Sequence, residues 1–422
     1  MRADEYFIHL LSCHLNGTNP VGYDVDWQEV LKYAKLHDLT GMVGAEINKI
    51  AKHYRPRGEV AEVFRQTMGR NLMEDGIKDD AVKKLITVLT VAKIPHMLVK
   101  GAVIKNLYPT PAFRTSGDID VVVKPSDFEN AIKVLTANGF DHEYTHTTVA
   151  ALTYNSFLFE IHTELDSINV QTKIYFSTPF DDISERVGYT YKLTPLYHLI
   201  YVIVHFAHHL RGSGAGIRMI MDIDVMIRNY PNLNWDDFWH LCSNMQIGKT
   251  AITCIALSKK WFNTPVKMDY AFEGEDGDVF YNNLIDVIIK GGIFGFENGG
   301  VGKEFVIQSV GNDGKAGKKT TVKAMLKWIF PPWQYLAETR PYLKKHPFLL
   351  PVAWITRPFR AIRNRKKVKE NVQDMISSQK ISERQVQVLN ELGISVGYGR
   401  WKADAKEAEE ARREIEKRNK QN

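Results

Sequence analysis

Cysteine is scarce in this sequence. Only three are present among the 422 residues, Cys13, Cys242 and Cys254, and no two of them form a C-x-x-C pair. An odd number of widely separated cysteines argues against both a disulfide framework and a zinc knuckle. We therefore expect three reduced, buried thiols.

Long apolar runs are also missing. A membrane-spanning helix needs about 20 predominantly apolar residues, and the best candidate, HLIYVIVHFAHHL, is shorter and carries several histidines. The first 17 residues include Asp4, Glu5 and His9 and lack the small-residue cleavage pattern of a secretory signal. These features predict a cytoplasmic protein without a membrane span.

Two familiar nucleotide-binding loops are excluded. The stretch GGVGKEF contains the Gly-Lys pair of a P-loop, but Glu297 stands where the first glycine is needed and Glu304 replaces the Ser or Thr that holds Mg²⁺. The stretch GSGAG at 212–216 follows no expected strand, so it is not a dinucleotide-binding fingerprint.

The sequence is long enough, and has enough hydrophobic residues, to form several domains. Its 44% hydrophobic and 25% charged residues are typical of a soluble globular protein, and the length exceeds that of one ordinary domain. Hydrophobic periodicity of 3.6 residues dominates both ends, whereas the middle alternates between strand and helix patterns. The pattern predicts a helical N-terminal lobe (1–80), an α/β core (81–190), a helical bundle (191–290), a Gly/Lys-rich loop with a Pro/aromatic region (291–365), and a charged helical tail (366–422).

The net charge of +6 is concentrated near the C-terminus. From Arg357 onward, 17 Lys and Arg residues face 10 Asp and Glu, whereas the residues before it carry 38 against 39. A basic segment can bind nucleic acid or an anionic lipid surface, but a solvated helical face is the commoner explanation. Nucleic acid is therefore not the favoured partner, although such binding would depend steeply on salt and disappear on truncation at Arg357. No pattern indicates an oligomeric state.

The core begins with a strand, a turn and a second strand. HMLV reads as a short strand that enters the turn Lys100-Gly101, and GDIDVVV reads as a strand. PSDFENAIKVLTANGF follows as a helix that stops at Gly139, and SFLFEIHTEL is a further alternating strand. A helix that crosses between two strands indicates an α/β unit.

Acidic residues sit within these strands. Asp118 and Asp120 share one face because successive side chains of a strand alternate. If the second strand pairs beside the first, Glu160 joins them as a third acid. Carboxylates this close repel one another unless a cation lies between them, and three of them around Mg²⁺ or Mn²⁺ suit two-metal phosphoryl transfer. The alternative is that Asp-Ile-Asp only ends a loop and is solvated.

Cationic and backbone groups precede the acids. Lys100-Gly101 lies at a strand-to-helix turn, where free N–H groups can hold phosphate. Arg114 lies four residues before Asp118, within reach of a phosphate near the metal.

A family resemblance follows from these motifs. The segment LVKGAVIKNLYPTPAFRTSGDIDVVVKPSDFENAIKVLTANGF, with its K-G turn, Y-P, Arg and D-I-D strand, resembles the uncharacterised nucleotidyltransferase family of the DNA polymerase β-like superfamily. FEIHTEL resembles the next strand of that family, and the resemblance extends from about residue 80 to 365. It implies an α+β fold in which a polymerase β-like core, a small mixed sheet with flanking helices, is embedded in helical N- and C-terminal regions.

The resemblance also implies an activity, which is metal-dependent transfer of a nucleoside monophosphate from an NTP to an acceptor hydroxyl or phosphate. We expect Asp118, Asp120 and Glu160 to hold the metal, with Glu160 as third ligand or general base. The residues expected to bind the nucleotide are Lys100, Gly101, Arg114, Gly117 and His162.

One departure from the superfamily leaves a second hypothesis open. Its usual turn is G-S or G-G, whereas Ala102 follows Gly101 here, which removes a hydroxyl that could donate to phosphate. A catalytically degenerate protein that senses nucleotide, or binds a partner as an antitoxin does, would fit this loss. The sequence does not identify the acceptor or the NTP.

The helices after residue 195 contribute further polar residues. His205, His208 and His209 share an apolar helix but lack the Glu of a zincin, so we expect structural or substrate-facing roles. Arg218 and Asp222 lie four residues apart and are expected to pair with each other, and the alternative is that they contact a nucleotide or an acceptor.

Overall fold

The computed structural model describes residues 1–212, 214–268, 272 and 274–292, and shorter stretches between residues 305 and 414. The described residues form one mixed seven-stranded sheet in the order β3-β4-β5-β2-β1-β7-β6. Its strands are β1 (His96–Leu98), β2 (Asp118–Val123), β3 (Asp141–Thr145), β4 (Val149–Tyr154), β5 (Phe157–His162), β6 (Ile183–Val187) and β7 (Thr190–Leu193). This sheet with its flanking helices confirms the expected α+β class.

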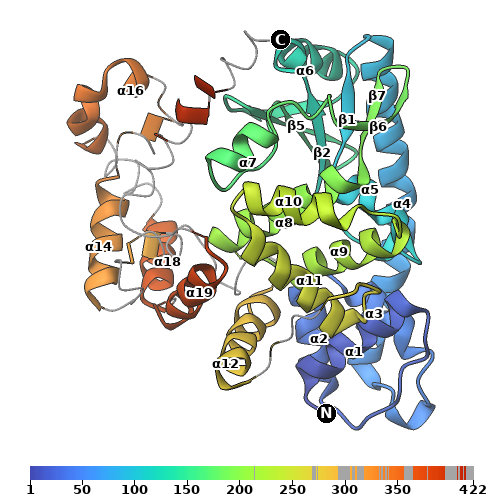
Figure 1. Ribbon diagram of the computed structural model, residues 1–422. Helices are drawn as coiled ribbons and strands as arrows, with labels where there is room; N and C mark the ends of the chain where they lie inside the picture. The colour runs from blue at the N-terminus through green and yellow to red at the C-terminus, as the bar shows by residue number, and fades with distance from the viewer. Residues whose placement is uncertain are drawn as a thin grey trace.

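Helices precede, cover and follow the sheet (Figure 1). The N-terminal lobe contains α1 (Ala3–Asn16), α2 (Trp27–Leu36), α3 (Thr40–Ile47) and the 3-10 helix η1 (Lys52–Tyr54). The helices that flank or connect the strands are α4 (Gly58–Val91), α5 (Gly101–Ile104), η2 (Lys105–Leu107), η3 (Pro111–Phe113), η4 (Pro125–Asp127), α6 (Phe128–Ala137) and α7 (Val170–Tyr175). The bundle after the sheet contains α8 (Pro195–Arg211), α9 (Ile217–Asn229), α10 (Trp235–Asn244) and α11 (Gly248–Phe262). The remaining described helices are α12 (Gly274–Leu284), the π-helix η5 (Ile285–Ile289), α14 (Lys318–Ile329), α16 (Tyr342–Lys345), η6 (Pro347–Leu349), α18 (Arg365–Ser377) and α19 (Gln379–Glu391).

Strand β2 separates an apolar layer from a polar one. Ile119, Val121 and Val123 are buried against α4, α6 and β5 in one hydrophobic cluster. Because side chains alternate along a strand, Asp118 and Asp120 project from the opposite face of the sheet. The apolar layer thus fixes the direction in which the two carboxylates point.

The second acidic strand lies beside the first, as the sequence predicted. β5 pairs with β2 in parallel, and Asp120 is the direct partner of Glu160. The chain reaches β5 through the hairpin of β4 and β5, and β3 pairs with the outer edge of β4. Neither β3 and β4 nor the hairpin of β6 and β7 was expected from the sequence.

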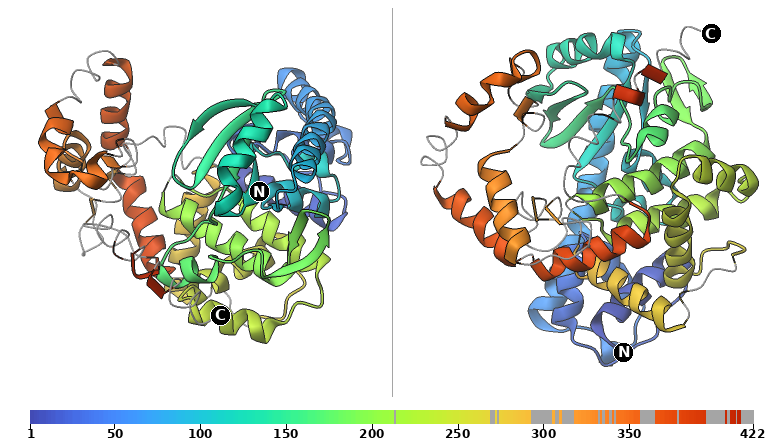
Figure 2. Two further views of the ribbon diagram at one scale, coloured as in Figure 1. Left: turned by 90° about the horizontal axis from the view of Figure 1, so that it is seen from above. Right: turned by 60° about the vertical axis from the view of Figure 1, so that its left-hand side comes forward.

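A single hydrophobic core joins the N-terminal lobe to the helical bundle. Buried residues of α1, α2 and α3 belong to the same cluster as those of α8, α9 and α11, and Figure 1 and the right-hand view of Figure 2 show these helices below the sheet. Helix α4 continues from the lobe along the sheet, so the boundary expected between residues 80 and 81 falls inside this helix. The division into five segments remains a prediction.

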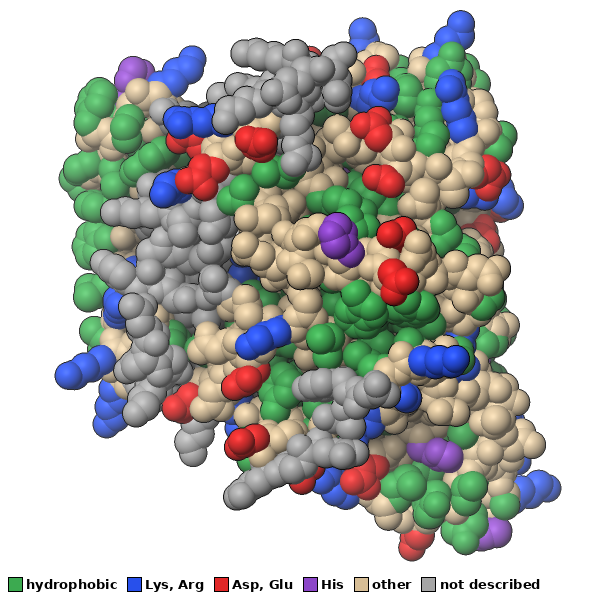
Figure 3. All heavy atoms as spheres, in the orientation of Figure 1, with side chains coloured by type: hydrophobic (Ala, Val, Ile, Leu, Met, Phe, Trp, Pro, Cys, Tyr) green, Lys and Arg blue, Asp and Glu red, His purple; other side chains and the backbone are tan. Residues whose placement is uncertain are grey.

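The C-terminal region is described only in part. The Gly/Lys-rich loop lies largely outside the described residues, whereas the boundary expected at residue 365 falls at the start of α18. Helix α14 exposes Val322, Leu326 and Ile329, and Figure 3 shows hydrophobic side chains along this edge of the molecule. Among the described helices, none is both long and apolar enough to span a membrane. The three cysteines are buried and free, as expected.

Candidate functional site

The parallel pairing of β2 and β5 gathers the acidic side chains on one face of the sheet. Asp120 is aligned with Glu160 and Val122 with His162, so the even-numbered residues of both strands point to the same side. Asp118, two residues before Asp120 on the same strand, shares this face. The arrangement that the sequence predicted from alternation is therefore present.

A cavity of about 970 Å³ lies above these carboxylates. This volume is at the upper end of the range for pockets that hold a small ligand or cofactor. Its lining includes all eight residues that were expected to bind metal or nucleotide, Lys100, Gly101, Arg114, Gly117, Asp118, Asp120, Glu160 and His162. It also includes residues of α2, α8 and α9, so the N-terminal lobe and the bundle close the cavity opposite the sheet.

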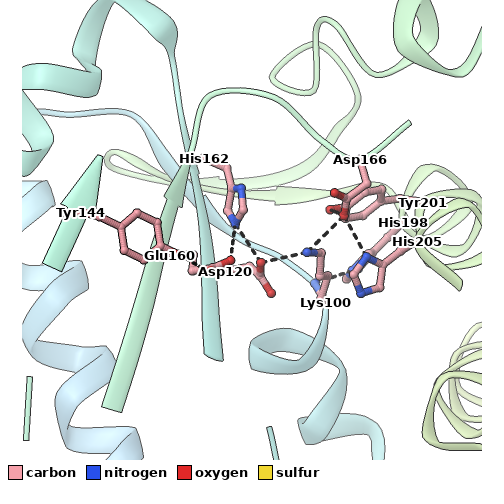
Figure 4. A network of polar contacts seen from close by, with 9 residues as sticks. All are labelled: Lys100, Asp120, Tyr144, Glu160, His162, Asp166, His198, Tyr201 and His205. Carbon is pink, nitrogen blue, oxygen red and sulfur yellow. Dashed lines mark hydrogen bonds and ion pairs between the residues drawn. The ribbon is translucent and has the colours of Figure 1, made fainter. Parts of the chain in front are cut away.

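Hydrogen bonds and ion pairs link the sheet to α8 in one network (Figure 4). His162 Nε2 donates to Asp120 Oδ1 at 2.9 Å and lies 3.4 Å from Glu160 Oε2. Lys100 Nζ is 2.9 Å from Asp120 Oδ1 and 3.2 Å from Asp166 Oδ2. Two cationic groups therefore contact the same buried aspartate.

Asp166 is the second centre of this network. His205 Nδ1 donates to its Oδ2 at 2.8 Å, and the Tyr201 hydroxyl donates to the same oxygen at 3.1 Å. Burial alone would raise the pKa of Asp166, but the charge of Lys100 and the bond from His205 hold it well below its usual value. Asp166 is therefore ionised and fixes one side of the Lys100 ammonium.

The acids of β2 differ in their protonation equilibria. Burial opposes ionisation of Asp120, but the charge of Lys100 and the bond from His162 outweigh burial and lower its pKa below the usual value. Burial also opposes protonation of His162, yet its bonds to Asp120 and Glu160 raise its pKa to about 9. For Asp118, burial and the nearby charge of Asp120 raise the pKa. Within the described part of the chain, Asp118 makes no ion pair.

These residues are able to hold a divalent cation. Asp120, Glu160 and His162 offer one ligand atom each, and these atoms lie within 4.8 Å of one another. Asp118 offers a further carboxylate on the same face of the sheet. The sequence expected Asp118, Asp120 and Glu160 as ligands, whereas the closest set contains His162 in place of Asp118. Carboxylates suit Mg²⁺ and Mn²⁺, and imidazole is a softer ligand.

The turn before the acids has a distinctive backbone. Lys100 adopts φ 52° and ψ −133° between β1 and α5, a conformation that costs a non-glycine residue about 1 kcal/mol or more. Its N–H donates to His198 Nε2 at 3.1 Å. Burial lowers the pKa of His198 to about 4, so the ring is neutral and able to accept this bond.

Gly101 is required by the position of Arg114. A Cβ atom at residue 101 would lie 2.3 Å from Arg114 Nη1 and 2.9 Å from its Cζ. The guanidinium thus rests directly on the turn and borders the cavity. At Gly117, by contrast, an added Cβ would meet none of the described atoms within 4 Å, so packing does not explain a glycine there.

The expected pairing of Arg218 with Asp222 is wrong. Asp222 Oδ2 accepts from Arg114 Nη2 at 2.5 Å, Asp222 Oδ1 accepts from Arg114 Nε at 3.1 Å, and the Tyr108 hydroxyl also donates to Oδ1 at 2.7 Å. Arg218 turns instead toward Thr115 and Asp38. Helical spacing places two side chains near each other, but a bidentate partner from another segment competes more strongly for the carboxylate.

Sequence reasoning missed Asp166 and underestimated His205. Asp166 follows the second acidic strand by four residues, which was an available signal for another carboxylate at the same edge of the sheet. His205, His208 and His209 were recognised as a group, and all three line the cavity. The contact of His205 with Asp166 depends on how α8 packs on the sheet, which the spacing of the histidines does not reveal.

Comparison with known proteins identifies the family of the chain. A family model described as "Uncharacterised nucleotidyltransferase" matches residues 23–263, more than half of the chain. The match begins before α2 and ends after α11, so it includes more of the N-terminal lobe and less of the C-terminal region than the range from about 80 to 365 expected from the motifs. No curated protein and no solved structure matches the chain. With its acidic strands, its cavity and this match, the chain belongs to the uncharacterised nucleotidyltransferase family.

Proposed function

We propose that this protein is a metal-dependent nucleotidyltransferase that moves a nucleoside monophosphate from an NTP to an acceptor hydroxyl or phosphate. The observation that carries the proposal is the parallel register of β2 and β5. It places Asp120 beside Glu160, with Asp118 on the same face, at the floor of a cavity large enough for a nucleotide.

A divalent cation fits the donor atoms that the chain offers. We assign its binding to Asp118, Asp120 and Glu160, because all three carboxylates line the cavity and Asp118 makes no ion pair with a described residue. When bound, Mg²⁺ or Mn²⁺ would neutralise triphosphate charge and make the attacking oxygen a better nucleophile.

The other cavity residues orient the two substrates. The Lys100 ammonium and the turn at Gly101 would contact the triphosphate, together with Arg114 and the open backbone at Gly117. His162 donates to Asp120 and lies beside Glu160, so it holds both carboxylates in place. Lys100, fixed by Asp166, is able to exchange a carboxylate contact for a phosphate oxygen without leaving the cavity.

The proposed transfer exchanges one bond at the α-phosphorus for another. An oxygen of the acceptor forms a bond to this phosphorus, and the bond from the phosphorus to the bridging oxygen of the β-phosphate breaks. The electron pair of that bond leaves with pyrophosphate. Where the acceptor is a hydroxyl, its proton passes to a carboxylate, for which Glu160 is our candidate.

The test uses each of the four NTPs labelled at the α-phosphate, with Mg²⁺ or Mn²⁺ and a small-molecule extract as the source of acceptor. We expect labelled product and pyrophosphate from the wild-type protein. Asp118→Asn and Asp120→Asn should reduce the rate at least about 100-fold, because they remove charge at the reacting centre. Asp141→Asn is the matched control, since Asp141 is an exposed carboxylate of the edge strand β3.

Two results would contradict the proposal. The first is turnover that survives both substitutions in β2. The second is NTP binding that needs no metal and leads to no product, which would favour the nucleotide-sensing alternative.

A further inference from the structure

The cavity is lined by side chains of both charges. The carboxylates of Asp118, Asp120 and Glu160 come from β2 and β5, and that of Asp166 comes from the chain just after β5, whereas Lys32 and Lys35 come from α2 and Arg218 comes from α9. The carboxylates and these three cations therefore belong to different parts of the fold, the sheet and the helices around it.

The positive charge of Arg218 is only partly compensated by neighbouring acidic groups. Its side chain is only 13% exposed. Only its Nη1 is bonded within the described part of the chain, to Thr115 O at 2.8 Å, to Thr115 Oγ1 at 2.9 Å and, at 3.5 Å, to Asp38 Oδ2. Burial and the nearby charge of Arg114 lower the pKa of Arg218. A largely buried guanidinium with unused N–H donors on a cavity wall is suited to binding an anion.

The other buried cations of the cavity are better compensated. Arg114 is paired with Asp222, and Lys100 with Asp120 and Asp166. Lys35 is exposed at the cavity mouth and makes no ion pair among the described residues, and the nearest carboxylate to Lys32 is that of Glu29 at 3.5 Å.

We propose that Arg218 and Lys35, with Lys32 beside them, form a site for a phosphate group that the acceptor carries away from its reacting oxygen. This inference rests on the proposed function, because it takes the carboxylates of β2 and β5 as the place of nucleotidyl transfer. It identifies the acceptor class as a phosphorylated compound, with a reactive hydroxyl toward Asp118 and Asp120 and a phosphate toward α2 and α9.

The position of these residues favours the acceptor over the NTP as the source of the phosphate. The metal ligands, the Lys100-Gly101 turn and Arg114 account for the triphosphate, and all of them belong to the segment from β1 to β5. Lys32 and Lys35 lie on a helix of the N-terminal lobe, which packs mainly against other helices of that lobe. In nucleotidyl transfer the core supplies the chemistry, so an element outside the core is suited to recognising the second substrate.

The test measures phosphate binding by calorimetry at low ionic strength. The probes are inorganic phosphate and glucose 6-phosphate, with glucose as the phosphate-free control, and a nonhydrolysable ATP analogue with Mg²⁺ reports on the nucleotide site. We expect Arg218→Gln and Lys35→Gln each to weaken binding of both phosphate probes about tenfold, while Lys35→Gln leaves the affinity for the ATP analogue unchanged. Lys52→Gln, in the exposed 3-10 helix of the same lobe, is the matched control.

Because Arg218 is largely buried, Lys35→Gln provides the second variant if Arg218→Gln fails to fold. Phosphate affinity that is equal in wild type and both variants, or undetectable in the wild type, would overturn the inference. Competitive displacement of phosphate by the ATP analogue would also overturn it, because the site would then belong to the triphosphate. Phosphate binding that depends on Arg218 and Lys35 in a protein that binds no ATP analogue would support the anion site and contradict the proposed function instead.

Discussion

At the scale of single residues, the site depends on side chains that constrain one another. Arg114 rests on Gly101 and is held by Asp222, so the turn, the guanidinium and α9 form one packed unit. A glycine is necessary at position 101 because of this close approach, whatever residue the turn itself would tolerate.

We therefore predict that Gly101→Ala destabilises the protein. The new methyl group would displace a buried, ion-paired guanidinium, and overpacking of this kind costs about 1–3 kcal/mol. The variant should also bind the NTP more weakly.

Gly76→Ala is the control, because that glycine lies in α4 and an added Cβ there would meet none of the described atoms within 4 Å. It should be neutral or stabilise the helix by up to about 1 kcal/mol. Urea denaturation compares the two variants, and equal stability would contradict the packing argument.

At the scale of elements, the hairpin of β4 and β5 delivers Glu160 to β2. Its two-residue turn, Asn155 and Ser156, has positive φ at both positions, 49° and 67°, as a type I′ turn requires. The turn was hard to recognise in advance because Asn-Ser lacks the glycine that marks such turns. Strand β3 is exposed at all five positions, so it has no buried alternation from which to predict it.

This turn leads to a second prediction. Ser156→Gly should stabilise the protein by about 1 kcal/mol, because glycine adopts positive φ without the steric cost that serine bears. Asn155→Gly should gain less, since asparagine tolerates this conformation better. Thermal melting of the two variants tests the difference. A lower melting temperature for Ser156→Gly than for the wild type would show that the turn does not limit the stability of the hairpin.

At the scale of the whole molecule, a buried neutral histidine joins distant segments. His37, at the end of α2, is fully buried, donates from Nε2 to Ile289 O at 2.8 Å, and accepts from the Ile217 N–H at 3.4 Å. Burial lowers its pKa to about 4. The ring ties the N-terminal lobe to η5 in either protonation state, but it accepts the bond from α9 only while it is neutral.

The third prediction concerns pH. Between about pH 6.5 and pH 4 the unfolded chain binds a proton at His37 and the folded protein does not, so the free energy of unfolding falls as the pH falls. A pKa shift of this size corresponds to a contribution of roughly 3 kcal/mol to the free energy of unfolding. This contribution is fully present above about pH 6.5. His37→Gln should be less stable than the wild type at neutral pH and lose less stability on acidification, as measured by urea denaturation at several pH values. His53→Gln, at an exposed position, is the control, and an unchanged pH slope in His37→Gln would refute the assignment.

The local features of this protein follow from its sequence alone. Alternation along the strand places Asp118 and Asp120 on one face of the sheet. In the strand FEIH it likewise places Glu160 and His162 on one face. The Lys100-Gly101 turn and the helical character of the chain after residue 194 were predicted for the same reason, because each depends on neighbours within a few positions.

The partners of those side chains, by contrast, depend on how the chain packs in three dimensions. Arg114 pairs with Asp222, which lies 108 residues further along the chain. Asp166 contacts both Lys100 and His205 because α8 packs on the sheet. Arg218, which the local pattern assigned to Asp222, is left facing a cavity instead. A buried charge binds whichever group supplies the best geometry at short distance, and that choice is made only when distant segments come together.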